Sequence, residues 1–130
     1  MLHVYAHERR VHGEDRHLWF RHGTSLVACV IDGHGGPGAA SLCHERLPSL
    51  YEEYHDDLVG LFRVLHEECV RELPCKSGCT LTLVCISEDG RITCANVGDS
   101  CALCLTSTTF RILTQTHRLQ DNPYERARLM

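Results

Sequence analysis

The stretch SLVACVIDGHGG, from Ser25 to Gly36, decides what is expected of the rest of the chain. The run before Asp32 is continuously apolar in its middle, which predicts a strand that is covered on both faces. The segment GHGGPG that follows Asp32 is too rich in glycine to continue a strand. We therefore expect a buried strand that ends abruptly in a loop carrying Asp32 and His34.

Two helices are predicted after this loop. The first runs from about Gly38 to Tyr54, where apolar residues recur at helical spacing, and Pro48 is expected to kink it or end it early. The second runs from Asp56 to about Leu73, with the acidic pair at 56–57 at its positive end. Each helix has one apolar stripe that needs a covering partner.

Strands are predicted on both sides of the helices. The clearest is a hairpin in which Glu88-Asp89-Gly90 supplies the turn. Many apolar residues lie on both faces of the later strands, so we expect an antiparallel β-sandwich flanked by the helices, a fold of the α+β class. The predicted strands cover residues 2–8, 16–22, 25–32, 80–87, 91–98, 100–107 and 110–115.

Length and composition restrict the class of protein. A chain of 130 residues has room for one domain, and 43% apolar with 23% charged residues is typical of a globular protein. The net charge of −4 argues against binding to nucleic acid or to an anionic membrane. The N-terminus MLHVYAHERR lacks the apolar core of a secretory signal. We expect an intracellular protein, cytoplasmic or nuclear and not secreted.

The cysteines are expected to be reduced thiols. There are nine, an odd number, and no secretory signal accompanies them. Two pairs are closely spaced, Cys75 with Cys79 and Cys101 with Cys104. Because a separation of three residues places side chains on opposite faces of a strand, we favour buried, inert cysteine over a zinc site for the second pair.

Acidic residues near Gly33 are candidate metal ligands. Magnesium and manganese prefer carboxylate, carbonyl and water oxygens, and such donors are available from Glu14, Asp15, Asp32 and the backbone at Gly33. Two bound ions can activate a water molecule for attack on phosphorus. Read without any family, the same residues are more often a turn at Asp-Gly and a solvated Glu-Asp pair than a metal site.

Six short motifs in one order make the first interpretation more specific. The motifs are RVHGED at 10–15, DGHGG at 32–36, SGCT at 77–80, ANVGDS at 95–100, LTQTH at 113–117 and ERARL at 125–129. Together they resemble the N-terminal half of the type 2C metal-dependent serine/threonine protein phosphatases, so residues 1–130 are expected to form a partial domain of that kind.

This resemblance implies a site with two divalent cations, manganese or magnesium. Glu14 would ligate one cation, Asp32 would bridge the two, and Gly33 would offer its backbone carbonyl. Asp99 corresponds to the aspartate that the family associates with a further, weakly held metal.

The resemblance also implies catalytic residues and a substrate. His34 would act as the general acid and Arg10 would hold the phosphate of a phosphoserine or phosphothreonine protein. Asp15 would orient bound water from the second shell of the metals.

The chain departs from the family pattern in three ways. Cys101 stands in place of arginine and Thr116 in place of aspartate. The third departure is larger, because the family's second half supplies two further metal-binding aspartates, so we expect an incomplete metal site. The missing strands would leave sheet edges unpaired, which favours self-association.

Three hypotheses follow from these departures. The chain retains hydrolysis, with dimerisation completing its sheets; or it is a phosphatase-like binding or regulatory module without catalysis; or it is a fragment of a longer natural chain.

Overall fold

The computed structural model describes residues 3–8, 13–73, 76–117, 122–124 and 127. The chain divides into two units. The helical unit contains residues 1–18 and 31–79, and the sheet unit contains residues 19–30 and 80–130. Each unit is described below by itself.

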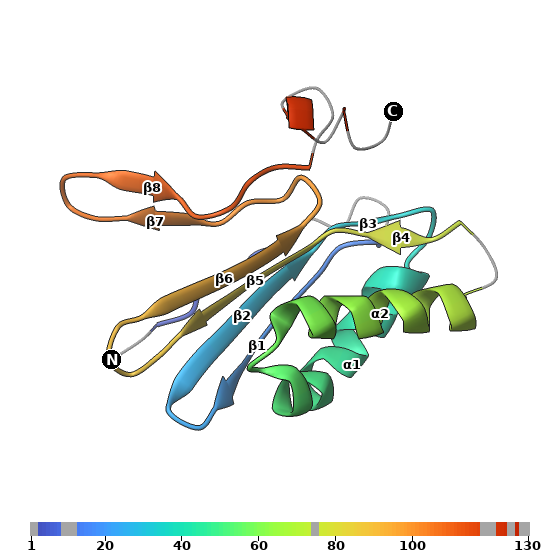
Figure 1. The fold of residues 1–130 in the computed structure, drawn as a ribbon, viewed down its shortest axis with the longest axis horizontal. Coiled ribbons are helices and arrows are strands. Elements are labelled where there is room, and N and C mark those ends of the chain that lie inside the picture. The colour runs from blue at the N-terminus through green and yellow to red at the C-terminus, as the bar shows by residue number, and fades with distance from the viewer. Residues whose placement is uncertain (1–2, 9–12, 74–75, 118–121, 125–126, 128–130) are drawn as a thin grey trace. The chain divides into compact units, whose positions relative to one another are not determined.

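Helix α1 (Gly38–Tyr54) of the helical unit has the bounds that the sequence predicts (Figure 1). It continues past Pro48 to Tyr54, so the proline does not end it early. Its buried residues recur at intervals of three and four, as an apolar helical stripe requires. They are Ala39, Ala40, Cys43, Leu47, Leu50 and Tyr51.

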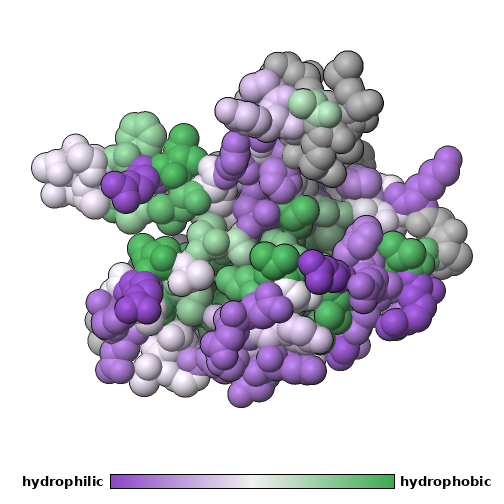
Figure 2. All heavy atoms as spheres, viewed as in Figure 1, coloured by the Kyte–Doolittle hydropathy of each residue, from purple (hydrophilic) through white to green (hydrophobic). Residues whose placement is uncertain are grey.

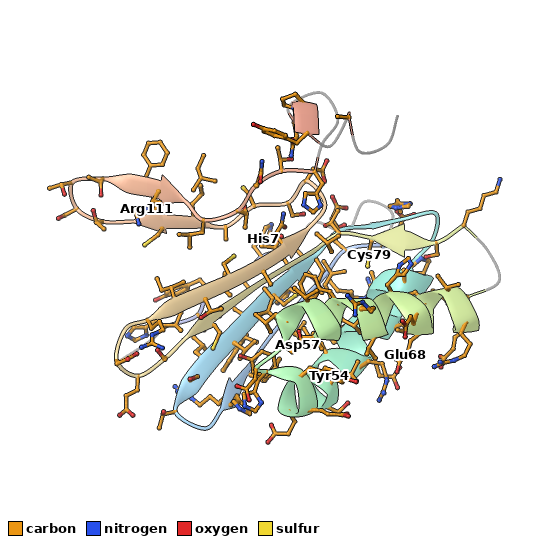
Figure 3. All side chains as sticks on the ribbon, viewed as in Figure 1. His7, Tyr54, Asp57, Glu68, Cys79 and Arg111 are labelled. Atoms are coloured by element: carbon orange, nitrogen blue, oxygen red, sulfur yellow. The ribbon has the colours of Figure 1, made fainter. Side chains whose placement is uncertain are left out.

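Helix α2 (Leu58–Glu72) begins later than predicted (Figure 1). Asp57 lies before its first turn as the N-cap, and its carboxylate accepts a hydrogen bond of 2.9 Å from the Gly60 amide (Figure 3). An aspartate in this position satisfies an amide that has no partner within the helix. The prediction that the helix includes the acidic pair at 56–57 is therefore wrong, because the pair precedes the helix.

Two very short strands complete the helical unit. β3 (Gly33–His34) pairs antiparallel with β4 (Gly78–Cys79), with Gly33 opposite Cys79 and His34 opposite Gly78. The sequence predicts that the glycine-rich segment after Asp32 contains no strand. This prediction is wrong for Gly33 and His34, which form the short strand β3.

The largest sheet has the strand order β1-β2-β5-β6 (Figure 1). β2 pairs antiparallel with β5, and β5 pairs antiparallel with β6. The turn of the second hairpin is the predicted one, with the Gly90 amide bonded to the Ser87 carbonyl at 2.9 Å. The four strands are β1 (Arg16–His22), β2 (Ser25–Ile31), β5 (Leu81–Ile86) and β6 (Ile92–Val97).

Strand β2 is fully covered on one face only. Cys29 and Leu83 are cross-strand partners, and both are buried. Side chains alternate between the faces of a sheet, so Val30 lies on the opposite face from Cys29. Val30 is 47% exposed. The prediction of complete burial on both faces of this strand is therefore wrong.

A separate two-stranded sheet is formed by β7 (Leu103–Leu105) and β8 (Phe110–Ile112). Both strands are shorter than the sequence predicts. Leu103 is opposite Ile112 and Leu105 is opposite Phe110, so the four side chains share one face. All four are more than half exposed, and apolar residues of this hairpin lie at the surface in Figure 2.

Antiparallel sheets with two helices confirm the predicted α+β class. The predicted strand at 2–8 is wrong for residues 3–8, which have no regular secondary structure. These residues alternate only partly between apolar and polar, and His3 and Tyr5 are exposed. Within the described residues, neither helix has the length and apolar character needed to span a bilayer.

Candidate metal site

The loop from β2 to α1 carries the central candidate residues. Gly33 is buried, whereas the neighbouring Asp32 and His34 are exposed. The pairing of β3 with β4 fixes the backbone at Gly33 and His34, because an antiparallel pair restrains both residues at once. The carboxylate and the imidazole are thereby presented at the surface from a restrained backbone.

Gly33 allows the N-terminal segment to lie directly against this loop. A Cβ atom at this position would overlap the backbone carbonyl oxygen of Glu14. The side chain of Glu14 also reaches the loop, because its Oε1 accepts a hydrogen bond of 3.3 Å from the Gly36 amide. The structure therefore brings Glu14 together with the segment that contains Asp32 and Gly33.

Ser77 joins the same loop to helix α1 and to strand β4. Its Oγ accepts a 2.9 Å hydrogen bond from the Ala39 amide in the first turn of α1. The hydroxyl donates to the Gly36 carbonyl at 3.2 Å. The Ser77 side chain thus provides a partner for an amide in the first turn of α1 and connects that turn to the loop at Gly36. Ser77 opens the SGCT motif, but the sequence did not identify it as a site residue.

The imidazole of His34 lies against the α-carbon of Gly78. A Cβ atom at Gly78 would be 2.6 Å from both Cε1 and Nε2 of the ring. No side chain fits in that space unless the ring moves. Gly78 is therefore a positioning residue for His34 that the sequence did not reveal as such.

Arg16 organises the acidic segment next to the loop. Its Nη1 donates to the backbone carbonyls of Gly13, at 2.8 Å, and Asp15, at 2.7 Å, and its Nη2 donates to Ser41 Oγ at 3.2 Å. Asp15 takes part here through its main-chain carbonyl. The predicted phosphate-binding residue, Arg10, lies outside the described residues.

Asp99 belongs to the sheet unit, whereas the other described candidates belong to the helical unit. It is exposed in the turn that follows β6. Beside it, the Gly98 amide donates to His117 Nδ1 at 3.2 Å, and the His117 amide donates to the Gly98 carbonyl at 2.9 Å. These two bonds connect the ANVGDS and LTQTH motifs, which are distant in the sequence.

Cysteine thiols lie next to the loop within the helical unit. The Sγ atoms of Cys43 and Cys79 are 3.8 Å apart. The hydrogen bond between the two thiols raises the pKa of Cys43, with burial acting in the same direction, and lowers the pKa of Cys79. The Asp32 carboxylate acts on Cys79 in the opposite sense, raising its pKa by charge repulsion. Cys79 therefore lies within the electrostatic reach of the candidate ligand Asp32.

The donor chemistry around Gly33 suits a hard divalent cation. Glu14 and Asp32 provide carboxylates, and the backbone of Gly33 provides a carbonyl. Magnesium retains several water ligands and needs few protein oxygens. Among the residues that the structure describes, however, no group of three or more His, Cys, Asp or Glu side chains is arranged to hold a metal ion. The donor types at Glu14, Asp32 and Gly33, two carboxylates and a carbonyl, are those that such a cation prefers.

The antiparallel α+β fold places a loop of oxygen donors between strand β2 and helix α1. The chain belongs to the protein phosphatase 2C family, whose sequence profile matches residues 21–130. That match extends over most of the chain and includes the loop at Asp32.

Two relatives are similar in sequence. Protein phosphatase 2C homolog 2 of Schizosaccharomyces pombe is 31% identical over 113 residues, with 77% of this chain and 30% of the relative covered. Protein phosphatase 2C 70 of Arabidopsis thaliana is 28% identical over 109 residues, with 70% of this chain and 19% of the relative covered. The chain therefore spans less than a third of the length of either relative.

Two solved structures are similar in fold. A C. elegans sex determining protein superimposes with a TM-score of 0.72 at 25% identity, covering 87% of this chain and 33% of that one. The PPM Ser-Thr phosphatase MsPP from Mycobacterium smegmatis, solved in complex with cacodylate, has a TM-score of 0.60 at 24% identity. That second match covers 92% of this chain and 57% of the other, and it supports the fold.

Proposed function

We propose that this chain contributes the first part of a metal-dependent protein phosphatase site that hydrolyses phosphoserine and phosphothreonine. The observation that carries the proposal is the junction of Glu14 with the loop of Asp32 and Gly33. At this junction, two segments that are distant in the sequence lie together, and both carry oxygen donors. Membership of the protein phosphatase 2C family supplies the reaction class.

The proposed metal ligands follow from this junction. Glu14 and Asp32 would hold manganese or magnesium with their carboxylates, Asp32 bridging two cations, and Gly33 would add its carbonyl. Asp99 would serve a further, weakly held cation. When bound, such cations supply an activated water and neutralise charge on the phosphate.

The remaining proposed roles belong to side chains of this chain. His34, exposed and seated against Gly78, would donate a proton to the leaving alkoxide. Arg10 would hold two phosphate oxygens with its planar guanidinium. Asp15 would orient water beside the ligands, from a backbone that Arg16 holds in place.

A second candidate function is a phosphatase-like binding module without turnover. It is favoured by the arrangement of the described residues, among which fewer than three His, Cys, Asp or Glu side chains converge at the loop. Such a module would bind a phosphoprotein through the same loop. Association with a second copy through exposed sheet edges is part of either candidate.

Hydrolysis of a phosphothreonine peptide with manganese tests the two candidates. We expect turnover that a chelator abolishes and that Asp32→Asn lowers by more than the roughly 10–100-fold typical of an outer-shell change. Asp56→Asn, which removes an exposed carboxylate before α2, is the matched control and is expected to behave as the unaltered chain.

Manganese binding, measured by calorimetry on the same proteins, distinguishes the phosphatase site from the binding module. Binding that depends on Asp32 without any turnover would support the binding module. A folded chain that neither binds manganese nor hydrolyses the peptide would contradict the phosphatase candidate, and one that also fails to bind the phosphothreonine peptide would contradict the binding module.

A further inference from the structure

Three cysteines from three different elements form a cluster in the helical unit. Cys43 lies in α1, Cys69 in α2 and Cys79 in β4, where Cys79 is labelled in Figure 3. The Cys43 thiol is 3.8 Å from that of Cys79, and Cys69 lies close enough to contribute to the raised pKa of Cys43. Their wide separation in the sequence means that only the folded chain assembles this cluster, which we call the thiol cluster.

The geometry of the thiol cluster suits a disulfide between Cys43 and Cys79. Sulfur atoms in a disulfide are about 2.05 Å apart, so the two sulfur atoms need to approach by less than about 2 Å. All three cysteines are reduced in the structure. A metal site is a poorer explanation, because no group of three or more His, Cys, Asp or Glu among the described residues is arranged to hold an ion.

The two partners differ in their access to solvent. Cys43 is only 4% exposed, whereas Cys79 is partly exposed on β4. A small oxidant in solution therefore reaches Cys79 before it reaches Cys43. The buried thiol is already in contact with the exposed one, as a resolving cysteine must be.

We propose that Cys79 and Cys43 are a peroxide-sensitive modification site that closes an intramolecular disulfide. In the first step the deprotonated sulfur of Cys79 attacks one oxygen of hydrogen peroxide. An S–O bond forms, the O–O bond breaks, and the departing hydroxide takes a proton to become water. The product at Cys79 is a sulfenic acid.

In the second step the sulfur of Cys43 attacks the sulfur of the sulfenic acid. The S–S bond forms, the S–O bond breaks, and a second water leaves with the thiol proton. Two thiols together lose two electrons, and these reduce one peroxide to two waters. Thiol–disulfide exchange with an added dithiol reverses the change.

Peptide mapping of peroxide-treated full-length chain tests this proposal. Cleavage after Lys and Arg separates the three cysteines of the cluster, because Arg46, Arg63, Arg71 and Lys76 lie between them. We expect a linked species that contains Cys43 and Cys79, lighter than its two reduced peptides by two hydrogens. Dithiothreitol should restore both free thiols.

Three single substitutions serve as variants and control. Cys79→Ser should abolish the link, and Cys43→Ser should leave a sulfenic acid at Cys79 that a 1,3-dione traps. Cys101→Ser, at an exposed cysteine outside the thiol cluster, should leave the link unchanged. If a variant does not fold, fragmentation of the linked peptides 22–46 and 77–91 from the unaltered chain still decides the question, because it distinguishes Cys43 from Cys29 and Cys79 from Cys85.

Two results would overturn the proposal. In one, peroxide oxidises Cys101 while Cys43 and Cys79 both remain open to alkylation. In the other, the linked peptides contain Cys69 in place of Cys79. Peptide mapping and thiol alkylation need neither bound metal nor turnover. Their result is therefore independent of the proposed function.

Discussion

At the scale of the residue, the position of His34 depends on the absence of a Cβ atom at Gly78. The imidazole occupies the place where the Cβ of any other residue at 78 would lie. The backbone pairing of Gly78 with His34 holds both α-carbons in register. The position of the ring in the structure is therefore one that glycine permits and that a larger residue would block.

Gly78→Ala is expected to lower phosphopeptide hydrolysis with little effect on manganese affinity. The added methyl group displaces the proposed acid, and a displacement of about 1 Å can cost 10²-fold in rate. The proposed ligands Glu14, Asp32 and Gly33 are not displaced directly. Steady-state rates and calorimetric manganese titration of the variant measure both quantities.

A double-mutant cycle with His34→Ala is the control for this prediction. If Gly78 acts through the ring, then Gly78→Ala adds nothing to the loss in the His34→Ala background. An equal loss in both backgrounds would show that Gly78 acts through the backbone of β4. In a chain without turnover, a shift of the His34 ring resonances reports the same displacement.

Single residues also show where sequence reasoning ends. The DGHGG motif identified Asp32, Gly33 and His34 because these residues are neighbours with a distinctive composition. The roles of Ser77 and Arg16 depend instead on amides and carbonyls that no side-chain pattern displays. Such partners become apparent only when the backbone has been placed.

At the scale of the element, helices α1 and α2 are joined by the ion pair of Arg46 and Glu68. Arg46 Nε and Nη2 each donate to Glu68 at 3.0 Å, an arrangement with two parallel bonds. The hydrogen bond from Arg46 lowers the pKa of Glu68. Both side chains are near the solvent, so salt screens the interaction.

This ion pair is expected to raise the melting temperature at neutral pH and to lose that effect at acid pH. Because the folded pKa of Glu68 is lowered, its contribution is complete well above the unfolded value of about 4.3 and is lost as the pH falls through the folded pKa. Glu68→Gln should therefore lower the melting temperature slightly at neutral pH and not at acid pH.

Scanning calorimetry at several pH values, with Glu67→Gln as the matched control, measures this difference. The control removes the same charge from the adjacent position of α2. A loss for Glu68→Gln that is the same at acid and neutral pH would contradict a role for the ionised pair. High salt should reduce the difference at neutral pH.

Elements were predicted well where a repeating pattern determines them. Helix α1 and the hairpin of β5 and β6 have strong periodicity and turn signals, and the structure confirms them. The pair β3–β4 depends on contact between residues 33–34 and 78–79, which local patterns cannot reveal. Residues 3–8 were assigned a strand from composition alone, and they have no strand partner within the described residues.

At the scale of the whole molecule, membership of the family was predictable because six motifs occur in order over most of the chain. The sequence predicted that surface for association would be exposed, but not where it lies. Unpaired edges were expected from the strands, but the structure concentrates exposed apolar side chains on one face of the β7–β8 hairpin. Exposed patches of this kind favour association.

We expect the purified chain to self-associate through this hairpin. Leu105 is 74% exposed and its cross-strand partner Phe110 is 67% exposed, so covering both removes much apolar area from water. The double variant Leu105→Lys, Phe110→Glu places opposite charges on neighbouring strands, which preserves the hairpin. Its dimer dissociation constant should rise by at least about tenfold, the equivalent of roughly 1.4 kcal/mol.

Sedimentation equilibrium over a range of protein concentrations measures this constant. Arg111→Gln is the matched control, because Arg111 pairs with Cys104 on the other face of the hairpin (Figure 3). A chain that stays monomeric at every concentration would contradict the prediction, as would a dimer that the double variant leaves intact. A dimer weakened only by the double variant would place the contact on the face that Leu105 and Phe110 share.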